Sequence, residues 1–360
     1  PRYETRNRHT FTKSVDVYDH NGVSQGAANT FTDLEETAYR DYYGSYYFTA
    51  NAEKKIGNHN FNLMLGASRE SFSDKYLMGY RRDFIYDTYE VINAGADNET
   101  KGNNGTMDEW LLVSAFGRFN YSYKDRYLFE ANMRHDGSSR FSKNNQWATF
   151  PSFSAGWRIS EENFMQSSKN IINQLKIRGS WGKLGNQNIG RTYYPFTSEL
   201  AVGSISLNGE VTPIVTLNDM ANENLKWEET TISGVGLDAQ LFNKFSFTFD
   251  WYNKTTSGIL MKLYITQLAG LNAPFQNAGK VENKGWEFST RYDNKFGDFK
   301  LGLGFNISDV KNKILEMKNT TDGTFLRQQT GYAINSIYGY IADGYYQNQE
   351  EIDNGPTQFG

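Results

Sequence analysis

The 360-residue chain contains no cysteine, which excludes a disulfide scaffold and any metal site built from thiolates. The absence also fits a location outside the cytoplasm. An excess of positive charge is missing too, because the formal net charge is −4. A nucleic-acid partner is therefore not expected, since such partners usually require a basic surface.

Long hydrophobic runs are also missing. Hydrophobic residues make up only 38% of the chain, and no apolar run approaches the roughly 20 residues that a membrane-spanning helix needs. A membrane protein of this composition must be a β-barrel, whose strands are apolar on one face only. Prolines number only 6, whereas aromatic residues reach 16% and glycines number 33. Aromatics favour strands and concentrate at membrane interfaces, so the composition favours a barrel.

Apolar and polar residues alternate with a period of two along most of the chain. In FSFTFDWYNK, Phe245, Phe247, Phe249 and Trp251 share one face of the predicted strand. Similar apolar stripes run through 61–67, 113–123, 127–133, 153–159, 175–181, 286–292 and 299–307, and weaker strands fit 39–52 and 230–241. We expect about eleven strands if the first 20 residues supply one.

The charges separate by face. None of the stripe positions is charged, although 22% of the whole chain is. A charge facing lipid at the midplane costs roughly 2–4 kcal/mol, whereas a wet lumen tolerates it. The stripes are therefore predicted to face lipid. The residues predicted to face the lumen are Arg118, Glu130, Arg134, Arg158, Arg178, Glu287 and Arg291.

The connections alternate in length. Short ones are expected at 54–60, 124–126, 242–244 and 294–298, and long ones at 68–110, 136–147, 184–228 and 257–284. Barrels have this arrangement, with short periplasmic turns and long extracellular loops. The link 160–174 is expected on the short-turn side, with one helical turn that Ser160 caps and with Glu161 and Glu162 in its first turn.

Seven stretches resemble the SusC/RagA family of TonB-linked outer-membrane transporters from Bacteroidetes, in that family's order. They are DGSSRF (136–141), WATFPSFSAGWRISEE (147–162), LKIRGSWGKLGNQNIG (175–190), NLKWEETTISGVGLDAQLF (224–242), DWYNKTTSGIL (250–260), NAGKVENKGWEFS (277–289) and INSIYGYIADGYYQNQEEI (334–352). The resemblance implies an all-β protein that crosses the bacterial outer membrane many times. The chain would be a portion of a 22-stranded antiparallel barrel that holds an internal plug.

The same resemblance implies partners. These are a SusD-like surface lipoprotein, the TonB–ExbB–ExbD energy system acting through the plug, and outer-membrane lipid. The family pattern is also compatible with a dimer of transporter–lipoprotein pairs. We expect residues 1–360 to form a partial barrel domain, with the plug domain and the C-terminal strands absent from this chain. A signal peptide is likewise not expected within it.

No catalytic constellation is recognisable. His9, His20, His59 and His135 are scattered without a metal-ligand spacing, so neither an enzyme nor a cofactor or metal site is expected. The stretch 97–109 (DNETKGNNGTMDE) has oxygen ligands suitable for calcium but lacks the EF-hand order. An ordinary solvated loop is favoured there. Four of the predicted lumen arginines could guide an anionic substrate, but plug contact or solvation is the default interpretation; they are Arg118, Arg134, Arg158 and Arg178.

Loop aromatics are the candidates for contact with a substrate or a lid protein. They are Tyr193, Tyr194, Phe196, Tyr338, Tyr340, Tyr345 and Tyr346. Such rings can stack on sugars or bind peptide, and the alternative is packing within the loops themselves. The favoured function is TonB-dependent import of oligosaccharide or peptide fragments together with a SusD-like lipoprotein. The alternatives are a passive porin and a structural or adhesive surface β-protein.

Overall fold

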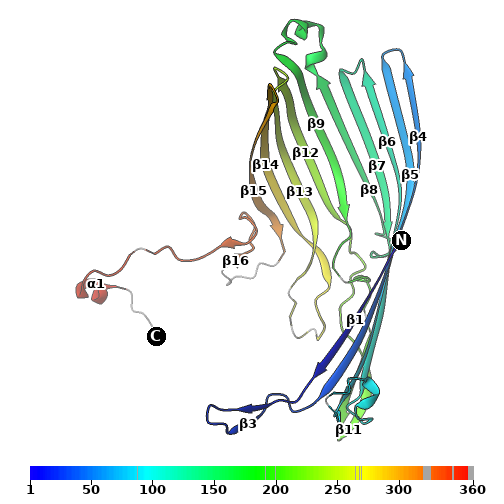
Figure 1. Cartoon of the computed structure of the whole chain (residues 1–360), viewed down its shortest axis with the longest axis vertical. Helices are drawn as coiled ribbons and strands as arrows, with labels where there is room; N and C mark the ends of the chain where they lie inside the picture. Colours follow the sequence, from blue (N-terminus) through cyan, green and yellow to red (C-terminus); the bar gives the residue numbers. More distant parts are fainter. Residues whose placement is uncertain are drawn as a thin grey trace.

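A computed structural model describes the chain except for residues 87, 191, 199, 264, 267, 269, 319–325, 343 and 356–360. Eleven strands form one antiparallel sheet, a partial barrel in which each strand pairs with the next one in sequence apart from inserted hairpins (Figure 1). In order across the sheet they are β1 (Arg2–Thr12), β4 (Asp33–Ile56), β5 (His59–Arg82), β6 (Gly102–Tyr123), β7 (Tyr127–Ser138), β8 (Trp147–Arg158), β9 (Ile172–Asn186), β12 (Glu228–Leu241), β13 (Phe245–Lys262), β14 (Phe275–Phe296) and β15 (Phe299–Met317).

Cross-strand register places all the predicted stripes on one face of this sheet. Phe249 lies opposite Phe288, which lies opposite Ile307, and the same parity continues through the neighbouring strands. We call this the apolar face. The other, polar face carries the charged residues; for example, Asp250 lies opposite Glu287. Period two in the sequence thus becomes two chemically distinct surfaces, because paired residues in an antiparallel sheet point the same way.

Tight turns close one end of the sheet. Lys124 and Asp125 have φ of 50° and 54°, and Phe242 and Asn243 have φ of 55° and 54°. Two consecutive positive φ values give a turn whose twist matches the right-handed twist of the flanking strands. Two residues are therefore enough to connect the strands of each hairpin. The longer connections lie at the opposite end, which we call the loop end (Figure 1).

The strands extend much further toward the loop end than alternation predicted. The expected long connection 68–110 is wrong in extent, because β5 runs to Arg82 and β6 starts at Gly102. β13 and β14 likewise continue into the expected loop 257–284. Away from lipid, both faces of a strand can be polar, so the hydrophobic period disappears while the hydrogen-bonded ladder continues. The residues Gly102–Glu109 of the predicted solvated loop therefore belong to β6.

The link 160–174 contains two 3₁₀ turns, η2 (Ile159–Glu161) and η3 (Asn163–Ser168). The predicted capping role of Ser160 is wrong, because neither turn has a side-chain cap and Ser160 lies buried inside η2. Glu162 lies between the turns in extended conformation. That conformation frees its carboxylate to reach neighbouring strands.

Several short elements lie in the connections at the loop end and in the segment after β15. They are β2 (Asp16–Tyr18) with β3 (Ser24–Ala27), η1 (Ile92–Ala94), β10 (Leu200–Leu207) with β11 (Glu210–Leu217), β16 (Leu326–Arg327) with β17 (Ser336–Ile337), and α1 (Gln349–Asn354). The segment that carries α1 extends away from the sheet (Figure 1). Among the described residues, no helix combines the length and apolar character needed to cross a membrane.

Candidate functional site

The polar face is organised around Arg178 in β9. Its Nη2 donates to Asp250 Oδ2 at 2.7 Å, and its Nε donates to Asp238 Oδ2 at 3.1 Å. Asp238 and Asp250 come from β12 and β13, so this cluster forms only once three strands are in register. Two carboxylates around one guanidinium leave a net negative charge, which makes Arg178 a poor guide for anions.

Arg134 and Arg291 are held in a simpler way, each by the aspartate two residues along its own strand. Arg134 Nε lies 2.7 Å from Asp136 Oδ1, and Arg291 Nε lies 2.6 Å from Asp293 Oδ2. Residues i and i+2 of a strand share a face, so each pair is neutral and local. Arg134 also donates to Ser114 Oγ of the neighbouring strand β6 at 2.7 Å.

The remaining predicted lumen residues lie on the same face with lighter contacts. Arg118 donates to Asn132 Oδ1 at 2.8 Å, and Asn132 donates to Glu130 Oε1 at 2.8 Å. Arg158 donates to the Asp125 carbonyl at 3.4 Å. Glu287 lines a hollow on this face together with Glu130, Lys176, Arg178 and Asp250. Register therefore brings all seven predicted residues onto one surface, but spread over many strands.

The apolar face is exposed rather than covered. Leu65, Met133, Leu303 and Phe305 each leave more than half of their surface accessible. The buried core instead lies at the loop end, where Phe141, Phe150, Ile189, Leu225 and Trp227 pack together. A sheet with this much uncovered apolar area needs an apolar partner, and the continuity of the face over the strands fits lipid.

The loop core contains a buried cation. Arg140 is 6% exposed, and its guanidinium lies 5.7 Å from the centre of the Trp110 ring and 5.1 Å from that of Tyr193. Its Nη1 donates to the carbonyl of Gly190 at 3.2 Å. No carboxylate of the described residues pairs with it, and burial lowers its pKa. Ring faces and carbonyl oxygens thus hold this charge and tie the connection after β9 to β6.

The candidate loop aromatics divide into two groups. Tyr193 is buried at 7% exposure in the loop core, and Tyr194 and Phe196 are half-buried. Tyr338, Tyr340, Tyr345 and Tyr346 are all exposed, on the segment that leaves the sheet. Tyr193 therefore packs against other segments, namely Phe72 of β5 and Arg140, while the second group presents open ring surface.

The predicted solvated stretch 97–109 is divided between an ion-paired loop and the start of β6. Asp97 pairs with Lys101 at 2.6 Å, and that hydrogen bond lowers the pKa of the aspartate. Asp108 belongs to β6. In the sheet register it lies opposite Asp74 of β5, and Asp74 lies opposite Asp41 of β4. Within the part of the chain that the structure describes, no cluster of three or more histidine, aspartate or glutamate side chains is arranged to hold a metal ion.

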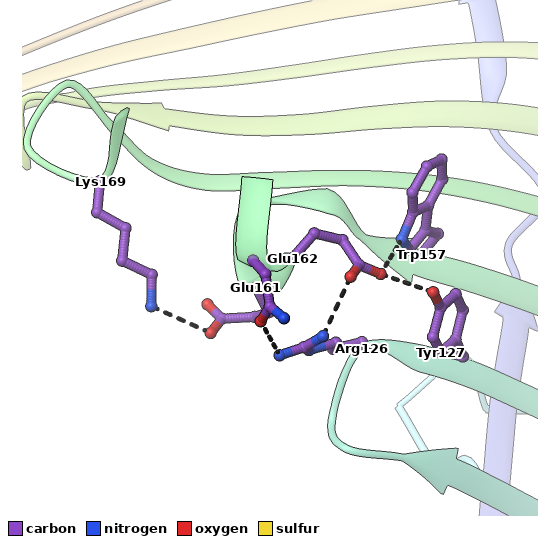
Figure 2. A network of polar contacts seen from close by, with 7 residues as sticks. Arg126, Tyr127, Trp157, Glu161, Glu162 and Lys169 are labelled. Carbon is purple, nitrogen blue, oxygen red and sulfur yellow. Dashed lines mark hydrogen bonds and ion pairs between the residues drawn. The ribbon is translucent and has the colours of Figure 1, made fainter. Parts of the chain in front are cut away.

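At the short-turn end, Glu162 joins three elements (Figure 2). Its Oε1 accepts from Tyr127 Oη at 2.7 Å and from Trp157 Nε1 at 3.1 Å, and its Oε2 accepts from Arg126 at 3.1 Å. These donors, Tyr127 first, lower the pKa of Glu162. The neighbouring Glu161 contacts only Lys169, at 3.3 Å, among the described side chains (Figure 2).

Sequence reasoning missed Arg140 and Glu162. Arg140 stands in the family-like string DGSSRF, and nothing local indicates that its partners are the rings of Trp110 and Tyr193 on other segments. The sequence predicts Glu162 in the first turn of a helix, although Tyr127 and Trp157, which donate to it, belong to predicted apolar stripes. An acidic residue next to interfacial aromatics was the available signal.

The chain is similar to known proteins over almost its whole length. Residues 2–356 match the family described as "TonB dependent receptor-like, beta-barrel". "TonB-dependent receptor P3" of Formosa agariphila is 37% identical, with 84% of this chain and 31% of that protein covered. "TonB-dependent receptor SusC" of Bacteroides thetaiotaomicron is 34% identical, with 84% and 31% covered.

Among solved structures, "Structure of the RagAB peptide transporter" superposes with a TM-score of 0.80 at 23% identity. That match covers 92% of this chain and 36% of the other, and it shows a shared fold. The chain thus spans about a third of the length of the curated relatives it matches.

Proposed function

This chain belongs to the TonB-dependent receptor-like β-barrel family, and from that membership we propose that the whole protein imports nutrient fragments across the bacterial outer membrane with energy from TonB. The chain is a multi-strand part of an outer-membrane barrel, and its relatives are receptors rather than enzymes. The observation that carries the proposal is the separation of faces: an exposed apolar surface backs a polar surface of paired charges.

The finer parts of the proposal concern cargo, orientation and partners. The cargo is an oligosaccharide or a peptide. Arg118, Glu130, Arg134, Arg158, Arg178, Glu287 and Arg291 face the lumen. A plug domain and further strands, encoded outside residues 1–360, complete the barrel. A SusD-like lipoprotein binds at the loop end, where Tyr338, Tyr340, Tyr345 and Tyr346 are exposed. A dimer of such transporter–lipoprotein pairs is compatible with this arrangement.

The importer and a passive porin differ in their energy source. A wide barrel with a polar lumen conducts freely unless something fills it. The full-length protein should therefore show little steady conductance in a planar bilayer. Uptake by cells should vanish when the proton gradient is collapsed or TonB is deleted. Steady conductance together with uptake that survives loss of the gradient would establish the porin instead.

A further inference from the structure

Among the described residues, the loop-end part of β6 has one side without a neighbouring strand. β6 pairs with β5 from Gly102 onward, but its pairing with β7 begins only at Leu112. On the β7 side, the main chain of Leu111 bonds to Ser139, the residue that follows β7. The Leu111 carbonyl accepts from Ser139 N at 2.9 Å, and the Leu111 N–H donates to Ser139 Oγ at 2.9 Å. Main-chain groups of alternate residues point the same way. The N–H and C=O of Met107 and Glu109 therefore point to this open side.

A hollow of about 610 Å³ lies beside this open edge. Its size falls within the usual range for ligand sites. Asp108 and Tyr194 line it from one side, and Asp219, Met220, Lys262 and Phe275 line it from the other. Bonds between 218–222 and 272–275 hold the other wall in place. Asn272 N donates to Asn218 O at 2.9 Å, and Asn222 Nδ2 donates to Phe275 O, at the start of β14, at 2.7 Å.

The charges of the hollow restrict what can occupy it. Lys262 lies 3.6 Å from Asp219 and above the Phe275 ring, so its ammonium is already engaged. Asp108 remains as an additional carboxylate, which makes the lining net negative. An anionic ligand is thus disfavoured, and a neutral or basic one is favoured. Tyr194, Met220 and Phe275 add apolar surface for side chains.

We propose that an extended peptide of neutral or basic composition binds here by adding a strand to the open edge of β6 at Met107 and Glu109, with its side chains in the adjacent hollow. Main-chain hydrogen bonds to a sheet edge supply affinity, and side-chain pockets supply selectivity. This inference rests on the proposed import function and selects peptide over oligosaccharide as its cargo. An oligosaccharide lacks the alternating N–H and C=O groups that the edge would pair with.

Binding is tested with the full-length receptor in detergent and a fluorescent hexapeptide of alternating valine and lysine. Backbone N-methylation is introduced at one peptide position at a time. Methylation at alternate positions should weaken the Kd about fivefold to tenfold each, because one strand edge bonds every second residue. A peptide with glutamate in place of lysine should bind at least tenfold more weakly. Equal effects at all positions, or none, would overturn strand addition.

Two receptor variants locate the site. Met107→Pro removes an edge N–H at a position where sheets tolerate proline, and it should weaken binding about fivefold. Tyr86→Ala, at an exposed loop tyrosine outside the hollow, is the control and should leave the Kd unchanged. Preferential binding of neutral oligosaccharides that Met107→Pro does not alter would overturn the inference. Failure of gradient-dependent uptake would instead refute the import proposal and leave peptide binding as a separate result.

Discussion

At the scale of single residues, the ionic contacts of the polar face fall into two kinds. Arg134–Asp136 and Arg291–Asp293 follow from spacing, because residues two apart share a face of a strand. These pairs could be read from the sequence once the strands were assigned. The cluster of Arg178, Asp238 and Asp250 could not be read in this way. It depends on the register between β9 and β12, which are joined by the long connection 187–227. Long-range register is information that period two does not carry.

The two kinds of ionic contact should contribute different amounts to the stability of the protein. Arg178→Leu leaves two half-buried carboxylates without their cation, so we expect the full-length protein to lose about 1–2 kcal/mol of unfolding free energy, after allowance for partial solvent screening. The matched control is Arg291→Leu, where both partners are more than half exposed. Urea unfolding in lipid vesicles measures both, and equal losses would show that burial of the Arg178 cluster is unimportant.

His9 provides a pH-dependent contact on the loop-end part of β1. It bonds Glu36 of β4 and Glu90 of the β5–β6 connection, and these bonds, Glu36 first, raise its pKa above 6.5. The protonated form is thus favoured in the folded state, so the contact is complete below pH 6.5 and is lost as pH rises through the raised pKa. Hydrogen-exchange protection factors of the amides around Glu90 should fall as pH rises from 6.5 through the raised pKa of His9. His9→Gln should remove the pH dependence, and an unchanged profile in that variant would contradict the assignment.

At the scale of elements, alternation located strands wherever lipid contact requires an apolar face. It predicted the turn-end parts of β5, β6, β13 and β14 but not their continuation at the loop end, where the hydrophobic period disappears. Sequence could likewise not show that the connections 139–146 and 187–227 form a core. Phe141, Ile189 and Trp227 stand in irregular segments, and their shared burial depends on contacts between them.

The link between β8 and β9 offers a test at this scale. Glu162→Gln keeps the shape of the side chain but removes the charge that Arg126, Tyr127 and Trp157 contact. We expect faster hydrogen exchange in η2, η3 and the 124–126 turn, because charge-assisted bonds are the stronger ones. Glu161→Gln is the matched control, since its pair with Lys169 is more exposed than the pair of Arg126 and Glu162. If both variants exchange alike, Glu162 does not organise this end of the sheet.

At the scale of the whole molecule, the proposed import function requires the two faces of the sheet to meet different media. Family and fold place the chain in an outer-membrane barrel, and from the charge separation we propose that the face of Phe247, Phe249 and Trp251 meets lipid. Water is then assigned to the face of Ser246, Thr248 and Asp250. The assignment explains why so many large apolar side chains remain exposed on one side only.

The most direct measurement uses the absence of cysteine from this chain. Single cysteines replace residues 246–251 one at a time in the full-length protein, and a spin label on each is probed in lipid vesicles with oxygen and with a water-soluble nickel complex. Labels at 247, 249 and 251 should collide mainly with oxygen, which partitions into lipid, and labels at 246, 248 and 250 mainly with nickel. Collision rates without this alternation, or with the opposite phase, would contradict the account.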